Sequence, residues 1–218
     1  FSMNAQLTAV SEGGNTGQRL STSNASNHGD IGSNAVDLSY SSGSSSTRGA
    51  TGGNAVAMGL GTTASGSYST AMGYVTRASE NYSTAMGQST TASGDTSTAM
   101  GYDTTASGSY STAMGYSTSA SGTYAVAMGY KTQAIGYLST AMGVRTIASD
   151  FSSTVIGQYN SSGSSVTNSA TIFSTSNTAF VIGNGTSGSL SDAFKVMFNG
   201  DTTVSNDLTV SGDVVISS

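Results

Sequence analysis

Few residues of this 218-residue chain have side chains that could do chemistry. His28 is the only histidine, and with Asp30 two residues later it could serve as a metal ligand or a general base. The sequence offers no second ligand or nucleophile in a matching pattern, and cysteine is absent. We therefore expect His28 to be an ordinary polar loop residue, and we expect no metal and no other cofactor.

The acidic residues do not form the close carboxylate pairs that glycosidases use. Four of them lie in the repeating units described below without forming such a pair: Glu80, Asp95, Asp103 and Asp150. Three more recur every six residues near the end of the chain: Asp201, Asp207 and Asp213. These three could hold a cation around a threefold axis, but we favour solvated turn residues. The lack of close carboxylate pairs in the sequence therefore predicts that the chain is not an enzyme.

Tyrosine is the residue type here best suited to contact another molecule, because its ring offers apolar area with a polar tip. The candidate contact residues form two series: Tyr74, Tyr102, Tyr116 and Tyr130, and Tyr68, Tyr82, Tyr110 and Tyr124. Exposed on one face, such series could stack on sugars or grip a protein receptor. Alternatively the rings pack between chains and stiffen an assembly, which is the interpretation that we favour since repeats preserve packing first.

A strict 14-residue repeat positions these tyrosines. Its most regular column is Met58, Met72, Met86, Met100, Met114, Met128 and Met142, with Ile156 in the next place. Glycine follows each of these residues, alanine or finally valine precedes it, and threonine or valine stands one place earlier. Columns of threonine and alanine follow four and six residues after the methionine. A period without insertions predicts a stack of identical structural units.

The content of each unit favours strands over helix. Glycine and β-branched residues in every turn would weaken a helix, whereas threonine or valine alternates with methionine in the period of a strand. Glycines such as Gly66 can supply turns. Each unit is then two short strands and two tight turns, one coil of a parallel β-solenoid, and eight coils at about 4.8 Å make a rod of roughly 40 Å. A period of two leaves open whether the methionine or the alanine columns face inward.

A coil of this composition encloses little core. Burying one methionine contributes about 1.5–3 kcal/mol, against roughly 1–2 kcal/mol of backbone entropy for each residue ordered. A single rod is therefore marginal, and we expect the chain to associate with copies of itself.

Composition excludes two other classes of partner. Only 8% of residues are charged, the net charge is -5, and the six lysines and arginines are scattered. This is not the basic patch of a nucleic-acid-binding protein. No segment approaches the roughly 18 apolar residues of a membrane-spanning helix, so direct membrane insertion is not expected.

The unit "YSTAMGYSTSASG" resembles the 14-residue head repeat of trimeric autotransporter adhesins of the Yersinia type. That family's motif is Ser-Val-Ala-Ile-Gly, and residues 69–73 read Ser-Thr-Ala-Met-Gly while residues 125–129 read Ala-Val-Ala-Met-Gly. The resemblance covers about residues 50–160. It implies a left-handed parallel β-roll, with three chains side by side at the exposed end of a surface fibre. Methionine for isoleucine and threonine for valine depart from the motif and imply a different packing at the centre.

The end of the chain is similar to a different kind of fibre. Residues 199–216 read NGDTTV, SNDLTV and SGDVVI, which resembles the β-prism or triple-β segments of phage tail fibres. Such segments often precede an endosialidase-type intramolecular chaperone domain, which trimerises the fibre and then cleaves itself off. The resemblance makes Ser218 a candidate maturation end.

The sequence thus predicts an all-β homotrimer of β-rolls with 14-residue coils. We expect an N-terminal adaptor or capping region at 1–49, the β-roll at 50–160, degenerate coils or a connector at 161–192, and a six-residue-repeat β-stem at 193–218. The expected function is a structural or adhesive fibre segment outside a cell or on a phage-like particle, with itself and a cell-surface or glycan receptor as partners. One alternative is an ice-binding β-solenoid with a flat threonine face. A second is a polysaccharide-degrading tail spike with paired acids in a groove, including one between chains.

Overall fold

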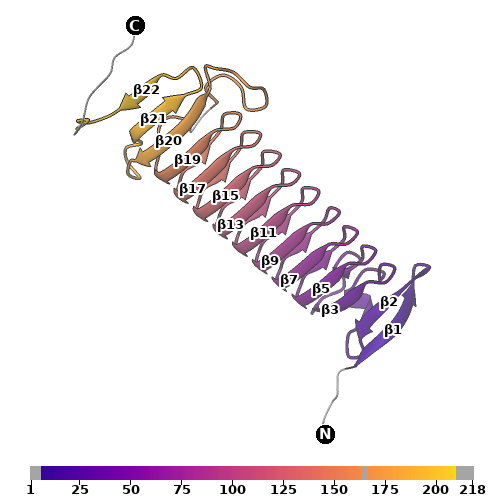
Figure 1. Ribbon diagram of the computed structural model, residues 1–218. Helices are drawn as coiled ribbons and strands as arrows, with labels where there is room; N and C mark the ends of the chain where they lie inside the picture. The colour runs from indigo at the N-terminus through magenta and orange to yellow at the C-terminus, as the bar shows by residue number, and fades with distance from the viewer. Residues whose placement is uncertain (1–5, 164–165, 210–218) are drawn as a thin grey trace.

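The computed structural model describes residues 6–163 and 166–209, which form a rod of stacked β-strands (Figure 1). Two sheets run along the rod, one of 14 strands and one of 8. The chain passes from one sheet to the other and back within each 14-residue unit. The parallel β-solenoid expected from the repeat is therefore confirmed.

Each unit contributes one longer and one very short strand. The longer strands of the repeat are β5 (Val56–Leu60), β7 (Thr70–Tyr74), β9 (Thr84–Gln88), β11 (Thr98–Tyr102), β13 (Thr112–Tyr116), β15 (Val126–Tyr130), β17 (Thr140–Val144) and β19 (Thr154–Gln158). The short strands are β4 (Gly49–Ala50), β6 (Thr63–Ala64), β8 (Arg77–Ala78), β10 (Thr91–Ala92), β12 (Thr105–Ala106), β14 (Ser119–Ala120), β16 (Gln133–Ala134) and β18 (Ile147–Ala148).

Strands of successive coils pair in parallel and in register. Met100 lies opposite Met86 on one side and Met114 on the other, and Ala99 lies between Ala85 and Ala113. Because the register equals the sequence period, every column of the sequence becomes a line of like residues along the rod. The 14-residue spacing thus fixes the pairing of the whole array.

The alanine columns face the interior, which answers the question that a period of two left open. The alanine before each methionine and the alanine six residues after it have no exposed area, from Ala57 and Ala64 to Ala141 and Ala148. Only small side chains fit because the two sheets lie close together inside a single chain. The close backbone approach that alanine and glycine permit therefore occurs within one rod.

The threonine column four residues after each methionine also faces inward. Its members are at most 1% exposed: Thr62, Thr76, Thr90, Thr104, Thr118, Thr132 and Thr146. In the described part of the chain their hydroxyl oxygens have no hydrogen-bond partner. A buried hydroxyl without a partner reduces stability, so this column fills space at an energetic cost.

The glycine after each methionine has a steric role that the sequence did not reveal. Gly101 has φ 123°, and a Cβ atom there would overlap the carbonyl oxygen of Gly115 in the next coil. The glycines at the other turn, such as Gly108, lack a positive φ but also lie against the neighbouring backbone. Glycine is therefore required after each methionine, both by close approach and by the left-handed backbone, whereas the other column also holds Glu80 and Asp150.

Antiparallel strands close both ends of the larger sheet. At one end, β1 (Leu7–Glu12) and β2 (Asn15–Leu20) form a hairpin that pairs with β3 (Val36–Tyr40), after a short 3₁₀ helix η1 (Ala25–Asn27). At the other, β20 (Thr178–Asn184) continues the rod in parallel and is followed by antiparallel β21 (Asp192–Met197) and β22 (Thr202–Val204). Such atypical terminal units cap the stack of coils, as in other repeat proteins.

The terminal regions add coils to the repeat. Val36 and Leu38 of β3 lie opposite Val56 and Met58 of β5, so the segment before residue 50 supplies one coil of its own. The six-residue repeat enters β22 and then reaches residues 210–218, which lie outside the described residues, as does Ser218. The β-prism stem and the four-part division of the chain stay predictions.

Candidate binding surface

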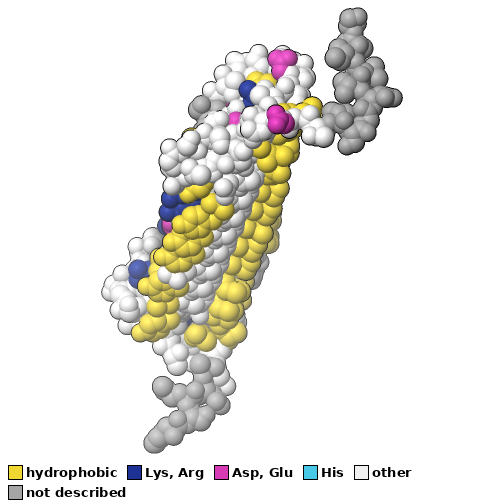
Figure 2. All heavy atoms as spheres, turned by 90° about the vertical axis from the view of Figure 1, so that its left-hand side faces the viewer, with side chains coloured by type: hydrophobic (Ala, Val, Ile, Leu, Met, Phe, Trp, Pro, Cys, Tyr) yellow, Lys and Arg dark blue, Asp and Glu magenta, His cyan; other side chains and the backbone are white. Residues whose placement is uncertain are grey.

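The methionine columns form one outer face of the larger sheet. This methionine face consists of Met58, Met72, Met86, Met100, Met114, Met128, Met142 and Ile156. Met58 and Met72 are 37% exposed and the others are half-buried, flanked by the threonine or valine two residues earlier. Figure 2 shows continuous hydrophobic bands along the rod. A continuous apolar band of this length on a single chain marks a surface for association.

The structure brings both tyrosine series to the surface, one at each turn of the coil. All eight predicted contact tyrosines are between 42% and 58% exposed. Within the first series, Tyr102 stacks on Tyr116 at 4.9 Å and Tyr116 on Tyr130 at 5.2 Å between ring centroids. Within the second, Tyr68 stacks on Tyr82 and Tyr110 on Tyr124. The rings thus form aligned stacks that stay open to solvent on this chain.

The second series occupies a strained position. Tyr68, Tyr82, Tyr110 and Tyr124 have φ between 56° and 60°, the left-handed region that a bulky residue adopts at a cost of about 1–2 kcal/mol. The first coils place Asn34 and Asn54 there, a residue type that tolerates this backbone well. The backbone conformation at this turn therefore does not favour tyrosine. The ring, which stacks and stays exposed, accounts for tyrosine at this position.

An aromatic series that sequence reasoning missed extends this second column toward the C-terminal end. Tyr124 contacts Tyr137 edge-on, Tyr137 stacks on Phe151, and the series continues through Phe173 to Phe198. Tyr137 and Phe151 are one repeat apart, so the spacing could have revealed that pair. Phe173 and Phe198 lie outside the regular repeat, and only the folding of the end region brings them into line.

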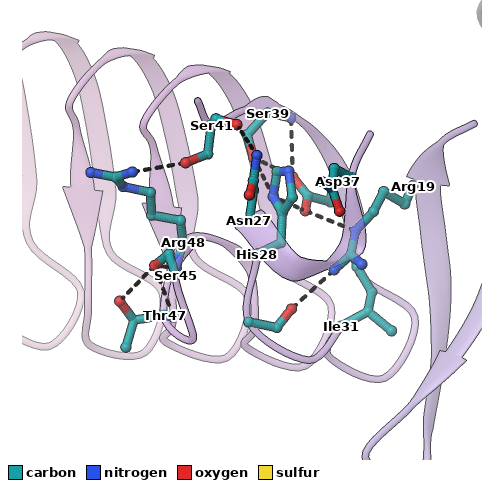
Figure 3. Close-up of polar contacts among 12 residues, drawn as sticks. Arg19, Asn27, His28, Ile31, Asp37, Ser39, Ser41, Ser45, Thr47 and Arg48 are labelled. Carbon is teal, nitrogen blue, oxygen red and sulfur yellow. Dashed lines mark hydrogen bonds and ion pairs between the residues drawn. The ribbon is translucent and has the colours of Figure 1, made fainter. Parts of the chain in front are cut away.

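His28 lies in the loop after η1, as expected of a polar loop residue, but it is buried there. Its Nδ1 lies 3.2 Å from Oδ2 of Asp37 and 3.4 Å from Oγ of Ser39 (Figure 3). Asp30, two residues further along the chain, is exposed. Arg19 completes the group from β2, with Nε 3.3 Å from the same Asp37 oxygen. A second Arg19 nitrogen donates to Glu12 at 2.7 Å.

This buried cluster closes the interior of the rod at its N-terminal end. Asp37 lies opposite Ala57, so it occupies the inward position that alanine fills in later coils. Burial alone would raise the pKa of Asp37, but hydrogen bonds from His28 and from the hydroxyl and backbone N–H of Ser39 outweigh it and lower the pKa. A carboxylate held in its charged form suits a structural role, because Asp37 can then pair with Arg19.

Among the described residues, the other acidic side chains do not assemble into a metal site. Asp150 is buried and accepts hydrogen bonds from the backbone N–H groups of Thr167 and Thr178, which fastens the end region to the last coils. Asp201 and Asp207 are exposed, whereas Asp213 lies outside the described residues. No group of three potential metal ligands occurs in residues 6–163 and 166–209.

Comparison with protein families matches the repeat to the YadA head domain repeat, in a family model that spans two copies. The matched residues are 50–75, 78–104, 106–132 and 134–160. This part of the chain therefore belongs to the YadA head repeats of trimeric autotransporter adhesins, a family of surface-exposed structural adhesins that form homotrimers. A search of curated protein sequences gave no match. Within the described ranges, no helix has the length and apolar character needed to cross a membrane.

Proposed function

We propose that this chain is a segment of a homotrimeric fibre that holds and presents binding surfaces outside a cell or on a phage-like particle. The methionine face carries the proposal. It is a half-exposed apolar band that runs along a YadA head repeat, and it would be covered if three rods pack around a common axis. The regular coils enclose mainly alanine, serine and threonine side chains, so packing between rods would supply the larger buried apolar area.

The adhesive part of the proposal assigns contact with a receptor to the tyrosine stacks. Tyr102, Tyr116 and Tyr130 repeat the same ring at successive coils, and three chains would present three such stacks. Individually weak contacts with a cell-surface or glycan receptor would then add through multivalency. In this proposal the rod acts as a rigid scaffold and catalyses no reaction.

Two observations support the fibre over the alternatives. The threonine column from Thr62 to Thr146 faces the interior, and the half-buried threonines two residues before the methionines lie on the apolar methionine face. Neither column therefore offers ice a flat threonine face. The carboxylate of Asp37 is buried against Arg19 and His28, so a polysaccharide cannot reach it.

Adhesion can be tested with beads that carry the 218-residue chain. Coated beads should adhere to cells of the natural habitat, and a variant with Tyr102, Tyr116 and Tyr130 changed to serine should adhere at least tenfold less, since each stacked aromatic contact contributes about 0.5–1.5 kcal/mol. A matched variant with Ser107 and Ser121 changed to alanine, on the outer side of the smaller sheet, should adhere normally. Equal adhesion by all three proteins would contradict the assignment of the tyrosines.

A further inference from the structure

A groove near the C-terminal end of the rod lies beside the tyrosine stack. It has a volume of about 390 Å³ and is lined by Ser117, Lys131, Gln133, Arg145, Ile147, Tyr159, Ser187 and Leu190. This volume falls in the range of small-ligand sites, about 300–1,000 Å³. None of the lining residues belongs to the methionine face, so the packing proposed for the trimer does not need to cover the groove.

The repeat itself builds one wall of the groove. Ser117, Lys131, Arg145 and Tyr159 occupy the same turn position in successive coils, each with a left-handed φ between 44° and 54°. Their side chains therefore project from the rod at intervals of about 4.8 Å. Gln133 of β16 and Ile147 of β18 continue this wall onto the smaller sheet.

The loop after β20 builds the opposite wall. The N–H of Ser191 donates to the carbonyl oxygen of Tyr159, and the amide of Gln158 donates to the carbonyl oxygen of Gly185 at 3.0 Å. These bonds hold the loop against the last coil and bring Ser187 and Leu190 to face the two cations. The groove is thus formed by two segments that hydrogen bonds keep in place.

The two cations in this groove lack counter-ions. In the described part of the chain, neither Lys131 nor Arg145 forms an ion pair, whereas Arg19 contacts both Glu12 and Asp37. Like charges side by side in neighbouring strands are destabilising. A chain with net charge -5 and only six cations nevertheless places two of them in adjacent coils of one groove. An anion bound between them would offset this repulsion.

Aromatic rings lie against both cations. Nζ of Lys131 is 5.4 Å from the centre of the Tyr130 ring, and Cζ of Arg145 is 5.7 Å from the centre of the Tyr159 ring. Such contacts orient the charged groups. They also set apolar ring faces next to positive charge, and Gln133 and Ser187 add hydrogen-bonding groups around them, while the Ser117 hydroxyl donates to Asp103 at 3.0 Å.

We infer that this groove binds a carboxylate-bearing sugar of a glycan receptor. Arginine matches a carboxylate with two parallel hydrogen bonds, and lysine adds a second positive charge. The tyrosine rings suit the apolar face of a sugar ring, while the serines and glutamine suit its hydroxyl groups. This inference rests on the proposed adhesive function and specifies the receptor that the fibre would recognise. Sialic acids and uronic acids share the chemistry, and both belong in the test.

The test compares acidic and neutral sugars on the full chain by saturation-transfer NMR and calorimetry. The probes are N-acetylneuraminic acid, glucuronic acid and, as the neutral counterpart, glucose. At least one acid should bind, and glucose should bind at least tenfold more weakly. Binding of one acid alone would identify the source of the carboxylate. No binding of either acid, or equal binding of glucose, would overturn the inference.

A double variant, Lys131→Ser with Arg145→Ser, tests the groove itself. Serine already occupies this turn position at Ser89 and Ser117, so the fold should persist. Acid binding should fall at least tenfold, while Arg77→Ser, an exposed cation outside the groove, should bind like the parent chain. Retained binding by the double variant would refute the site. The native mass, measured on the same samples, reports separately on the trimer, because the groove lies within a single chain.

Discussion

Residue types repeat strictly inside the rod and vary on its outer surface. Inside, the same small residues recur coil after coil without exposed area, as in the columns that begin at Ala57 and Ala64. Outside, one turn position holds Val75, Ser89, Asp103, Ser117, Lys131 and Arg145 in successive coils. The interior therefore tolerates almost no substitution, because two backbones meet there. The exterior can change its residue types without disturbing the fold. Partners are to be sought where the columns vary or stay exposed.

The largest effect is expected where the backbone of one coil touches the next. Gly101→Ala should lower the free energy of unfolding by at least about 3 kcal/mol, because a Cβ atom would overlap Gly115 and the left-handed backbone strains any other residue. Urea unfolding followed by circular dichroism measures this change. Gly188→Ala is the control, since nothing lies within 4 Å of the new atom. A Gly101 variant as stable as this control would contradict the close packing of coils.

The buried cluster at the N-terminal end should come next. Asp37→Ala removes the partner of Arg19 and His28 and should cost about 3 kcal/mol, as removal of one partner from a buried ion pair does. Asp30→Asn, at an exposed carboxylate nearby, should leave the unfolding curve unchanged. Equal stability of the two variants would show that the cluster does not hold the end of the rod together.

The same cluster predicts a pH dependence. The pKa of Asp37 in the folded chain is lowered from its ordinary value of 3.8. The ionised Asp37 therefore contributes its full stabilisation above pH 3.8, and this stabilisation is lost as the pH falls through the pKa of the folded chain. The stability difference between the parent chain and Asp37→Asn should therefore shrink in acid. Denaturant unfolding at a series of pH values between neutrality and strong acid measures it. A difference that stays constant throughout would argue against a charged Asp37.

On the outside, substitutions on the methionine face should disrupt assembly and leave the coil intact. Changing Met100 and Met114 to lysine should weaken association at least 100-fold, or about 2.7 kcal/mol, because charges would be buried between chains. The circular dichroism spectrum of the single rod should persist. Lysines at Ser107 and Ser121, which face outward from the smaller sheet, should leave the assembly unchanged. Sedimentation equilibrium distinguishes these results.

The smallest effect is expected for an isosteric change inside the rod. Thr104→Val keeps the shape of the side chain and removes a buried hydroxyl that has no partner among the described residues, so it should be neutral or stabilise by up to about 1 kcal/mol. Thr105→Val, on the outer side of the smaller sheet, serves as the comparison in the same thermal melts. A clear loss of stability at Thr104 would reveal a hydrogen bond for this hydroxyl.

The regular part of the fold could be read from the sequence, because one period sets both the strands and their register. The pairing of Met100 with Met114 and the alignment of Tyr116 with Tyr130 follow from that period. The inward face could not be read, since a period of two is symmetric between Ala99 and Met100. Burial of His28 also escaped prediction, because only the folded chain brings Arg19 of β2 and Asp37 of β3 beside it. The groove at Lys131 depends on the loop after β20, which lies outside the repeat.

The native mass of the 218-residue chain tests the central claim most directly. Light scattering coupled to size-exclusion chromatography should give three times the chain mass of 21.6 kDa, and the assembly should resist dissociation on a denaturing gel before heating. This result is expected because the methionine face leaves each rod with an apolar surface that only its own copies are proposed to cover. A folded species of 21.6 kDa at micromolar concentration would contradict the trimeric fibre.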